Sequence, residues 1–106
     1  MSFAFLLSDT DVPPHVDRIR DQTITEDEVA VFVTRFTGKP EPRVEWLMGS
    51  RILVDDGDDV KIVTRRQTSE LTLRDVRPGK YTVTVRVSNE AGTDSQSAKL
   101  VVKGEH

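Results

Sequence analysis

The sequence contains no cysteine, and this absence excludes two kinds of stabilising cross-link. Without thiols the chain forms no disulfide, and it lacks the Cys and His spacings of structural zinc sites. Small secreted β-domains usually depend on disulfides, so the absence favours a reducing, cytoplasmic location. The only asparagine, Asn89, is followed by Glu90-Ala91, so there is no Asn-X-Ser/Thr acceptor for glycosylation either.

Histidine is scarce, and this argues against catalysis. A hydrolytic triad needs a histidine that is held by an acid and faces a nucleophile. Only His15, near the start of the chain, and His106, at its end, are present, and the sequence places no such partners beside them. There is also no glycine-rich phosphate loop. We therefore expect no enzymatic activity, no catalytic residue and no cofactor.

The acidic run Asp55–Asp59 is the one candidate for a metal site. Calcium takes about six to eight oxygen ligands, usually from a loop with a distal bidentate glutamate. Because this run has no such glutamate, we interpret it as a solvated turn and expect no dedicated metal site. Weak calcium binding stays open.

Long apolar runs are absent too. No segment approaches the roughly 20 apolar residues of a membrane-spanning helix. Phe3–Leu7 is apolar, but it is shorter than a signal-peptide core and no basic region precedes it. The net charge of -3 gives no electrostatic reason to expect nucleic acid or a membrane as a partner. Other proteins are the expected partners, and the isolated chain is expected to be a monomer.

What the sequence does have is alternation with a period of two. Short segments of this kind recur every 8–12 residues between turn signals, as in a sandwich or barrel. The 106 residues suffice for one such domain. Two stretches alternate most clearly: residues 30–36, with Ala30, Phe32, Thr34 and Phe36 inward, and residues 81–88, with Tyr81, Val83, Val85 and Val87 inward. The sequence thus predicts an all-β, antiparallel sandwich of seven or eight strands.

Several segments resemble the intermediate-set (I-set) immunoglobulin domains of giant muscle proteins such as titin, twitchin, obscurin and myosin-binding protein C. The resemblance covers roughly residues 13 to 103, and its most specific part is the Gly-x-Pro-x-Pro-x-Val-x-Trp stretch from Gly38 to Trp46. The other carrying segments are Pro13-Pro14, Thr25–Val29, Asp59–Ile62, Ser69–Val76, Tyr81 and Asn89–Gly92. It implies an immunoglobulin-like domain at 12–103, with a linker or extension at 1–11 and a tail at 104–106.

The chain departs from the family pattern in its cysteines and its tyrosine corner. Thr34 occupies the first cysteine position, so the inter-sheet disulfide is missing. The second position falls on Val83 when counted from Tyr81, and on Val85 when counted back from Asn89. We prefer Val83, because Tyr81 is the only tyrosine able to make the corner hydrogen bond. The acidic residue of the family corner is absent.

These assignments define a core and a possible contact face. The expected core contains Thr34, Trp46, Leu71, Leu73, Tyr81 and Val83. Because alternate strand residues point to opposite faces, Val31 and Val33 must point outward. By the same reasoning Val63 and Thr72 point outward, and the family's strand order places all four on one sheet. They form either a docking face or simply β-branched residues that suit strands.

The resemblance implies a non-catalytic interaction and spacer module in a sarcomeric or cytoskeletal protein. Neighbouring immunoglobulin domains or filament proteins would then be its partners, and its two ends should leave from opposite poles. An extracellular adhesion or receptor module is one alternative, although the absence of cysteine weighs against it. A regulatory domain beside a kinase in a giant muscle protein is another.

Overall fold

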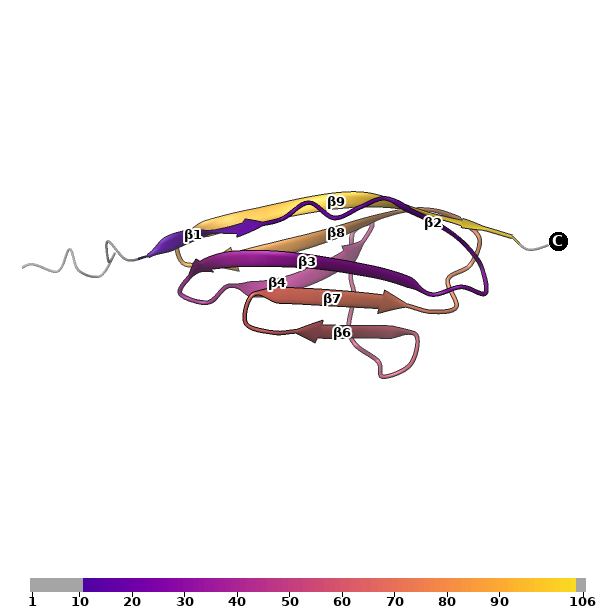
Figure 1. Cartoon of the computed structure of the whole chain (residues 1–106), viewed down its shortest axis with the longest axis horizontal. Coiled ribbons are helices and arrows are strands. Elements are labelled where there is room, and N and C mark those ends of the chain that lie inside the picture. Colours follow the sequence, from indigo (N-terminus) through magenta and orange to yellow (C-terminus); the bar gives the residue numbers. More distant parts are fainter. Residues whose placement is uncertain (1–10, 105–106) are drawn as a thin grey trace, which may run out of the picture.

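The computed structural model describes residues 11–104, which form two β-sheets packed face to face (Figure 1). Nine strand segments make up the sheets. They are β1 (Val12–Val16), β2 (Gln22–Thr25), β3 (Ala30–Lys39), β4 (Arg43–Met48), β5 (Arg51–Ile52), β6 (Val60–Thr64), β7 (Thr68–Leu73), β8 (Gly79–Asn89) and β9 (Gly92–Lys103). The extension predicted at 1–11 lies outside the described residues except for Asp11, and so does the tail beyond residue 104.

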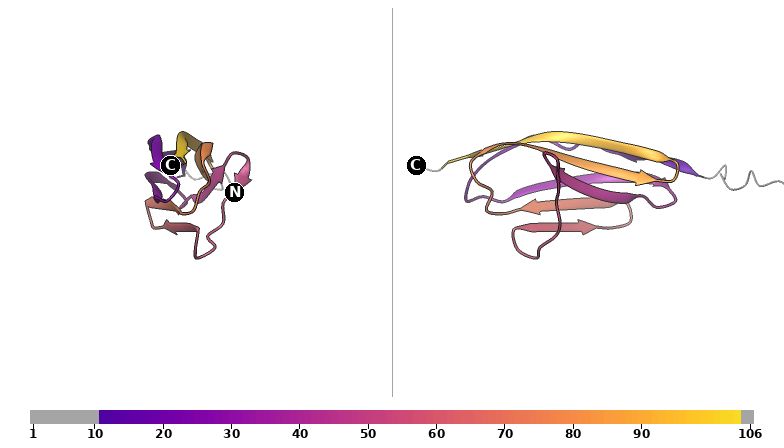
Figure 2. Two further views of the ribbon diagram at one scale, coloured as in Figure 1. Left: turned by 90° about the vertical axis from the view of Figure 1, so that its right-hand side faces the viewer. Right: turned by 180° about the vertical axis from the view of Figure 1, so that it is seen from behind.

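The strands are arranged as a four-stranded sheet, β1-β3-β7-β6, and a five-stranded sheet, β2-β9-β8-β4-β5. Figure 2 shows the two layers from further sides. All neighbouring strands are antiparallel except β2 and β9, which are parallel. The all-β sandwich predicted from the sequence is confirmed, and this parallel pair is the exception to its antiparallel pairing.

The number of segments exceeds the predicted seven or eight because the first strand is divided. The chain pairs with β3 through β1, leaves that sheet after Asp17, and joins β9 of the opposite sheet through β2. The two-residue β5 adds another segment. The first strand thus pairs with both sheets in turn, as β1 and then as β2. As a result, the part of β3 before Arg35 has no partner strand on the side of β1.

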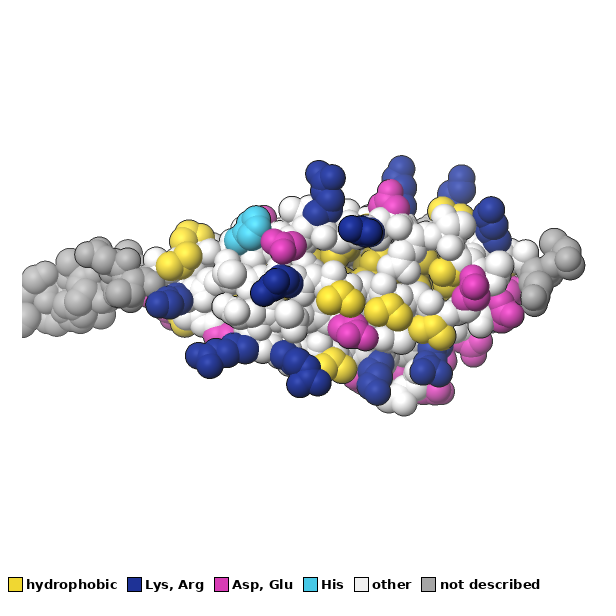
Figure 3. Space-filling view, viewed as in Figure 1, with side chains coloured by type: hydrophobic (Ala, Val, Ile, Leu, Met, Phe, Trp, Pro, Cys, Tyr) yellow, Lys and Arg dark blue, Asp and Glu magenta, His cyan; other side chains and the backbone are white. Residues whose placement is uncertain are grey.

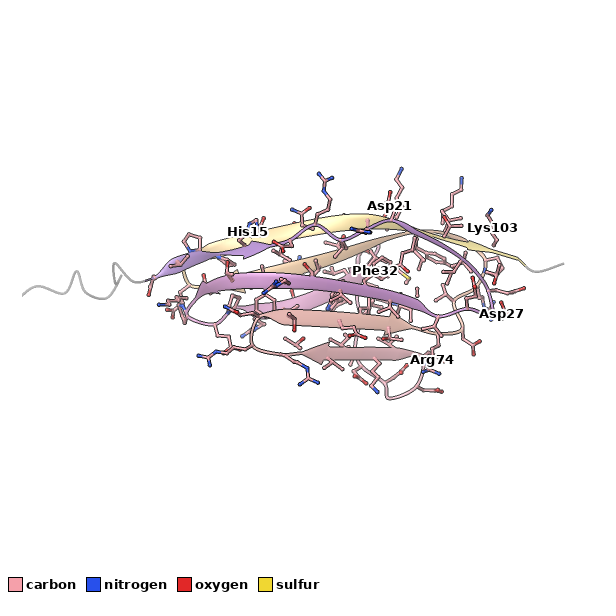
Figure 4. The ribbon with its side chains drawn as sticks, in the orientation of Figure 1. His15, Asp21, Asp27, Phe32, Arg74 and Lys103 are labelled. Carbon is pink, nitrogen blue, oxygen red and sulfur yellow. The ribbon has the colours of Figure 1, made fainter. Side chains whose placement is uncertain are left out.

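Strand β3 shows how the sequence pattern becomes burial. Its residues alternate between buried and exposed from Ala30 to Thr37. Phe32 points between the sheets (Figure 4), and Phe36 is buried in the same way. Since side chains of a strand alternate between its two faces, the residues between them are forced outward. The inward and outward faces predicted for this strand are those observed.

Trp46 of β4 occupies the centre of the core and is 1% exposed. Its indole Nε1 donates a hydrogen bond of 2.9 Å to Oγ of Ser69 on the opposite sheet. A buried N–H group without an acceptor lowers the stability of the folded state. This hydrogen bond therefore allows the indole ring, with its one polar N–H group, to lie in an apolar core. It also links the two sheets directly, from side chain to side chain.

The other predicted core residues lie beside this centre. Thr34, Leu71, Leu73 and Val83 are buried, and the Thr34 hydroxyl donates to the carbonyl of Asp17 at 2.8 Å. Tyr81 differs from the prediction, because it is only half-buried at the margin of the core. Its hydroxyl reaches out of the apolar interior and donates to the carbonyl of Arg77 at 2.7 Å.

The two ends of the described chain lie at opposite ends of the sandwich: β1 begins at one end and β9 finishes at the other (Figure 1). This arrangement suits a unit placed within a linear series of domains. No helix in the described part of the chain is long and apolar enough to cross a membrane.

Candidate functional site

The outward face of the four-stranded sheet brings together the residues predicted as a contact face. Pairing of β3 with β7 places Val31 opposite Thr72 and Val33 opposite Glu70. Pairing of β6 with β7 then places Val63 on the other side of Glu70. Glu70 therefore lies between Val33 and Val63, and the predicted patch is interrupted by a carboxylate.

A continuous apolar row runs instead along the first part of β3 and the residue just before it. Val29, Val31 and Val33 are 44%, 40% and 54% exposed, and they follow one another at the two-residue spacing that places side chains on the same face. We name these three residues the valine stripe. Figure 3 shows hydrophobic side chains in a row across this face. An exposed apolar row rimmed by charges is typical of a surface that contacts another protein.

Charged side chains border the valine stripe. Arg35 continues the row of outward β3 residues, and Lys61 lies across Thr72 from Val31. In Figure 3 basic side chains lie above, below and to the left of the hydrophobic row, whereas acidic side chains lie directly beneath it and beyond its right-hand end. The face therefore offers branched apolar side chains in the middle and charged side chains of both signs at the margin, with Arg35 and Lys61 among the basic ones and Glu70 among the acidic ones.

The acidic run 55–59 forms a turn that is closed by its own backbone. The Asp55 carboxylate accepts hydrogen bonds from the amides of Gly57 and Ile62 at 2.8 and 2.9 Å. These bonds hold the pKa of Asp55 below its ordinary value. Asp56 accepts from Asp58 and Val60 in the same manner, again with a lowered pKa.

Asp59, in the same turn, behaves in the opposite way. Partial desolvation and the nearby carboxylates of Asp58 and Asp75 raise its pKa. Within residues 11–104 no three Asp, Glu or His side chains are arranged to hold a metal ion. The carboxylates of Asp55 and Asp56 serve as caps for backbone amides, which agrees with the interpretation of this run as a turn.

His15 lies between two carboxylates on the surface of the molecule. Its Nε2 is 3.3 Å from Asp17 Oδ1 and its Nδ1 is 3.6 Å from Asp94 Oδ2. Asp94 also accepts a hydrogen bond from the backbone amide of Val16, at 2.9 Å. These contacts join β1 to β9 on the exterior of the molecule. We assign them a structural role.

Sequence reasoning missed Val29 and Glu70. Val29 precedes the assigned strand, yet its odd number gives it the same orientation as Val31 and Val33, so the alternation already contained the signal. Glu70 could be found only from the register between β7 and its neighbours. That register is set by packing between strands and is not contained in the pattern of any one strand.

Comparison with known proteins identifies the domain. The family model described as "Immunoglobulin I-set domain" matches residues 13–102. The chain is 32% identical to the muscle M-line assembly protein unc-89 of Caenorhabditis elegans over 94 residues, which are 88% of this chain and 1% of that protein. It is 29% identical to titin of Drosophila melanogaster over 98 residues, which are 92% of this chain and, to the nearest per cent, 0% of that protein.

A solved structure has the same fold. One chain of the solved complex between titin M10 and an obscurin-like 1 immunoglobulin domain superposes with a TM-score of 0.83 at 21% identity, covering 92% of this chain and 99% of the matched one. The chain spans about one hundredth or less of the two relatives named above, and it corresponds to a single domain of such proteins. The chain belongs to the immunoglobulin I-set family.

Proposed function

We propose that this domain is a non-catalytic protein-interaction and spacer module of a modular sarcomeric or cytoskeletal protein. The observation that carries the proposal is the valine stripe, three exposed branched side chains that follow one another in a row. Exposed apolar surface is costly in water, and soluble domains commonly keep it where a partner covers it.

Two further observations support the role. The similarity to muscle proteins favours a sarcomeric setting inside the cell, as does the absence of cysteine. The opposite positions of the two ends suit a spacer that transmits tension along a series of domains. Neighbouring immunoglobulin domains or filament proteins are the proposed partners. Titin M10 forms a complex with an obscurin-like 1 immunoglobulin domain in one solved structure, so domains of this fold do bind one another.

The test is to replace Val31 and Val33 by threonine and to compare the proteins recovered from muscle extract by quantitative mass spectrometry. Threonine keeps the β-branch but removes apolar surface, so we expect an unchanged free energy of unfolding and reduced recovery of a specific partner. The matched control replaces Ile52 and Val54, which are 49% and 72% exposed on another part of the surface.

Equal recovery of every protein with wild type and the Val31/Val33 variant would contradict the proposal. A loss of recovery that occurs equally with the Ile52/Val54 control would also contradict it, because the effect would then belong to apolar surface in general.

A further inference from the structure

The side of β3 that faces away from β7 is open along the valine stripe. Val31 and Val33 are opposite Thr72 and Glu70 in the β3–β7 ladder. The backbone amide of Phe36 donates a hydrogen bond to the carbonyl of Gln67, just beyond the β3–β7 ladder. Because hydrogen-bonded residues recur at every second position, the even-numbered residues of β3 make the bonds to β7. In an antiparallel pair the residues between hydrogen-bonded pairs direct their own N–H and C=O groups away from the partner strand. Val31 and Val33 therefore present their backbones to the open side.

Strand β1 occupies only the far part of that side. Its pairing with β3 runs from Lys39 to Phe36, and a last bond joins the amide of Asp17 to the carbonyl of Arg35 at 2.9 Å. Beyond Asp17 the chain crosses to the other sheet, where β2 pairs with β9. As a result Val33 lies on the first stretch of β3 that has no neighbouring strand.

One side chain partly caps this edge. Gln22 of β2 donates a hydrogen bond from Nε2 to the carbonyl of Val31. A glutamine amide in this position occupies an acceptor that another strand would use, which is one way in which exposed edges are protected from unspecific pairing. No comparable bond reaches the backbone of Val33 from the described residues.

The open edge is bordered by positive charge. The segment that crosses between the sheets, residues 17–21, begins beside Arg35 and ends beside Val31. It carries Arg18 and Arg20, both exposed. Within residues 11–104, no ion pair or side-chain hydrogen bond engages Arg18, Arg20 or Arg35. The two carboxylates of the segment are already engaged, Asp17 with His15 and Asp21 with the amide of Lys99.

From this combination we infer that the edge accepts an extended acidic segment of a partner protein as an additional strand. The inference rests on the proposed function and names the class of partner for the same face. Backbone groups of the partner pair with Val31 and Val33 after Gln22 yields its acceptor. Apolar side chains on alternate partner residues extend the valine stripe, and carboxylates lie beside the arginines. Strand addition of this kind takes affinity from main-chain hydrogen bonds and specificity from alternate side chains.

The experiment is a selection of random peptides, displayed on phage, against the folded domain at low ionic strength. We expect the enriched peptides to combine acidic residues with alternating β-branched residues. A synthetic copy labelled with a fluorophore then gives the affinity by polarisation. Methylation of one backbone nitrogen that faces β3 should weaken binding about tenfold, the equivalent of one hydrogen bond.

Changes in the domain test the same geometry from the other side. Replacing Arg18 and Arg20 by glutamine should weaken binding and reduce its dependence on salt. Gln22→Ala should strengthen binding, because it removes the competing donor to Val31. The charge control is Arg51→Gln, at an exposed arginine on β5, and it should leave the affinity unchanged.

The outcomes separate this inference from the proposed function. If the threonine variant of Val31 and Val33 weakens binding but backbone methylation does not, partners use the face without adding a strand, and the inference fails alone. Selected peptides that bind equally well to all these variants would overturn both. If the selection enriches basic peptides, or enriches no peptide at all, the inference that the partner segment is acidic is contradicted.

Discussion

The hydrogen bond between Trp46 and Ser69 should be a measurable source of stability, because both side chains are almost completely buried, at 1% and 0% exposure. Ser69→Ala leaves the indole N–H without its acceptor, and an unsatisfied buried donor costs about 1–3 kcal/mol. Trp46→Phe removes the donor and part of the ring, and should cost less than the roughly 3–5 kcal/mol of truncation to alanine. In the double variant neither partner remains, so its loss should be smaller than the sum.

A double-mutant cycle gives this coupling directly. Urea unfolding should be followed by far-ultraviolet circular dichroism, because Trp46 is the only tryptophan and its replacement removes the fluorescence signal. We expect a coupling of about 1 kcal/mol or more. Losses that add within about 0.3–0.5 kcal/mol would refute the reasoning, since that is the behaviour of independent sites.

Three further predictions concern other parts of the fold. Gly38→Ala should destabilise the domain by about 1–3 kcal/mol in urea unfolding, because φ is +149° and an added Cβ would lie 2.8 Å from the nearest side-chain atom; an unchanged midpoint would contradict this. Asp55→Asn should lower stability at pH 7. Because the pKa of Asp55 in the folded state lies below the ordinary 3.8, the difference in stability between wild type and variant should persist above pH 3.8 and vanish as the pH falls below it. A stability difference that does not depend on pH would contradict this prediction. Thr34→Cys should oxidise with only one of Val83→Cys and Val85→Cys in a thiol assay, since a disulfide requires Cα atoms within about 4.4–6.8 Å. The register favours Val85, because Thr34 lies opposite Ser69, whose hydroxyl accepts a hydrogen bond from Trp46, and Trp46 lies opposite Val85; oxidation with Val83→Cys alone would contradict this.

The fold was predictable because alternation and burial coincide in this chain. In β3 every inward residue is apolar or threonine, so the pattern specified both the strand and its buried face. The switch of the first strand between sheets was not predictable. It depends on the pairing of β2 with β9, and the residues of β2 are only partly buried and carry no strong pattern.

The contact face was predictable in orientation but not in composition. Period two placed Val31, Val33 and Val63 outward, and all three are exposed. The insertion of Glu70 between Val33 and Val63, and the cap on Val31 by Gln22, depend on interstrand register and on a crossing segment. A linear pattern holds neither kind of information.

The most direct test of the account is chemical-shift mapping of the isotopically labelled domain with its bound partner or a selected peptide. If the β3 face is the binding surface, the largest amide shifts should cluster on Val29, Val31 and Val33, with small shifts at Ile52 and Val54. Shifts concentrated around β5 or at either end of the sandwich, with β3 unaffected, would contradict the account.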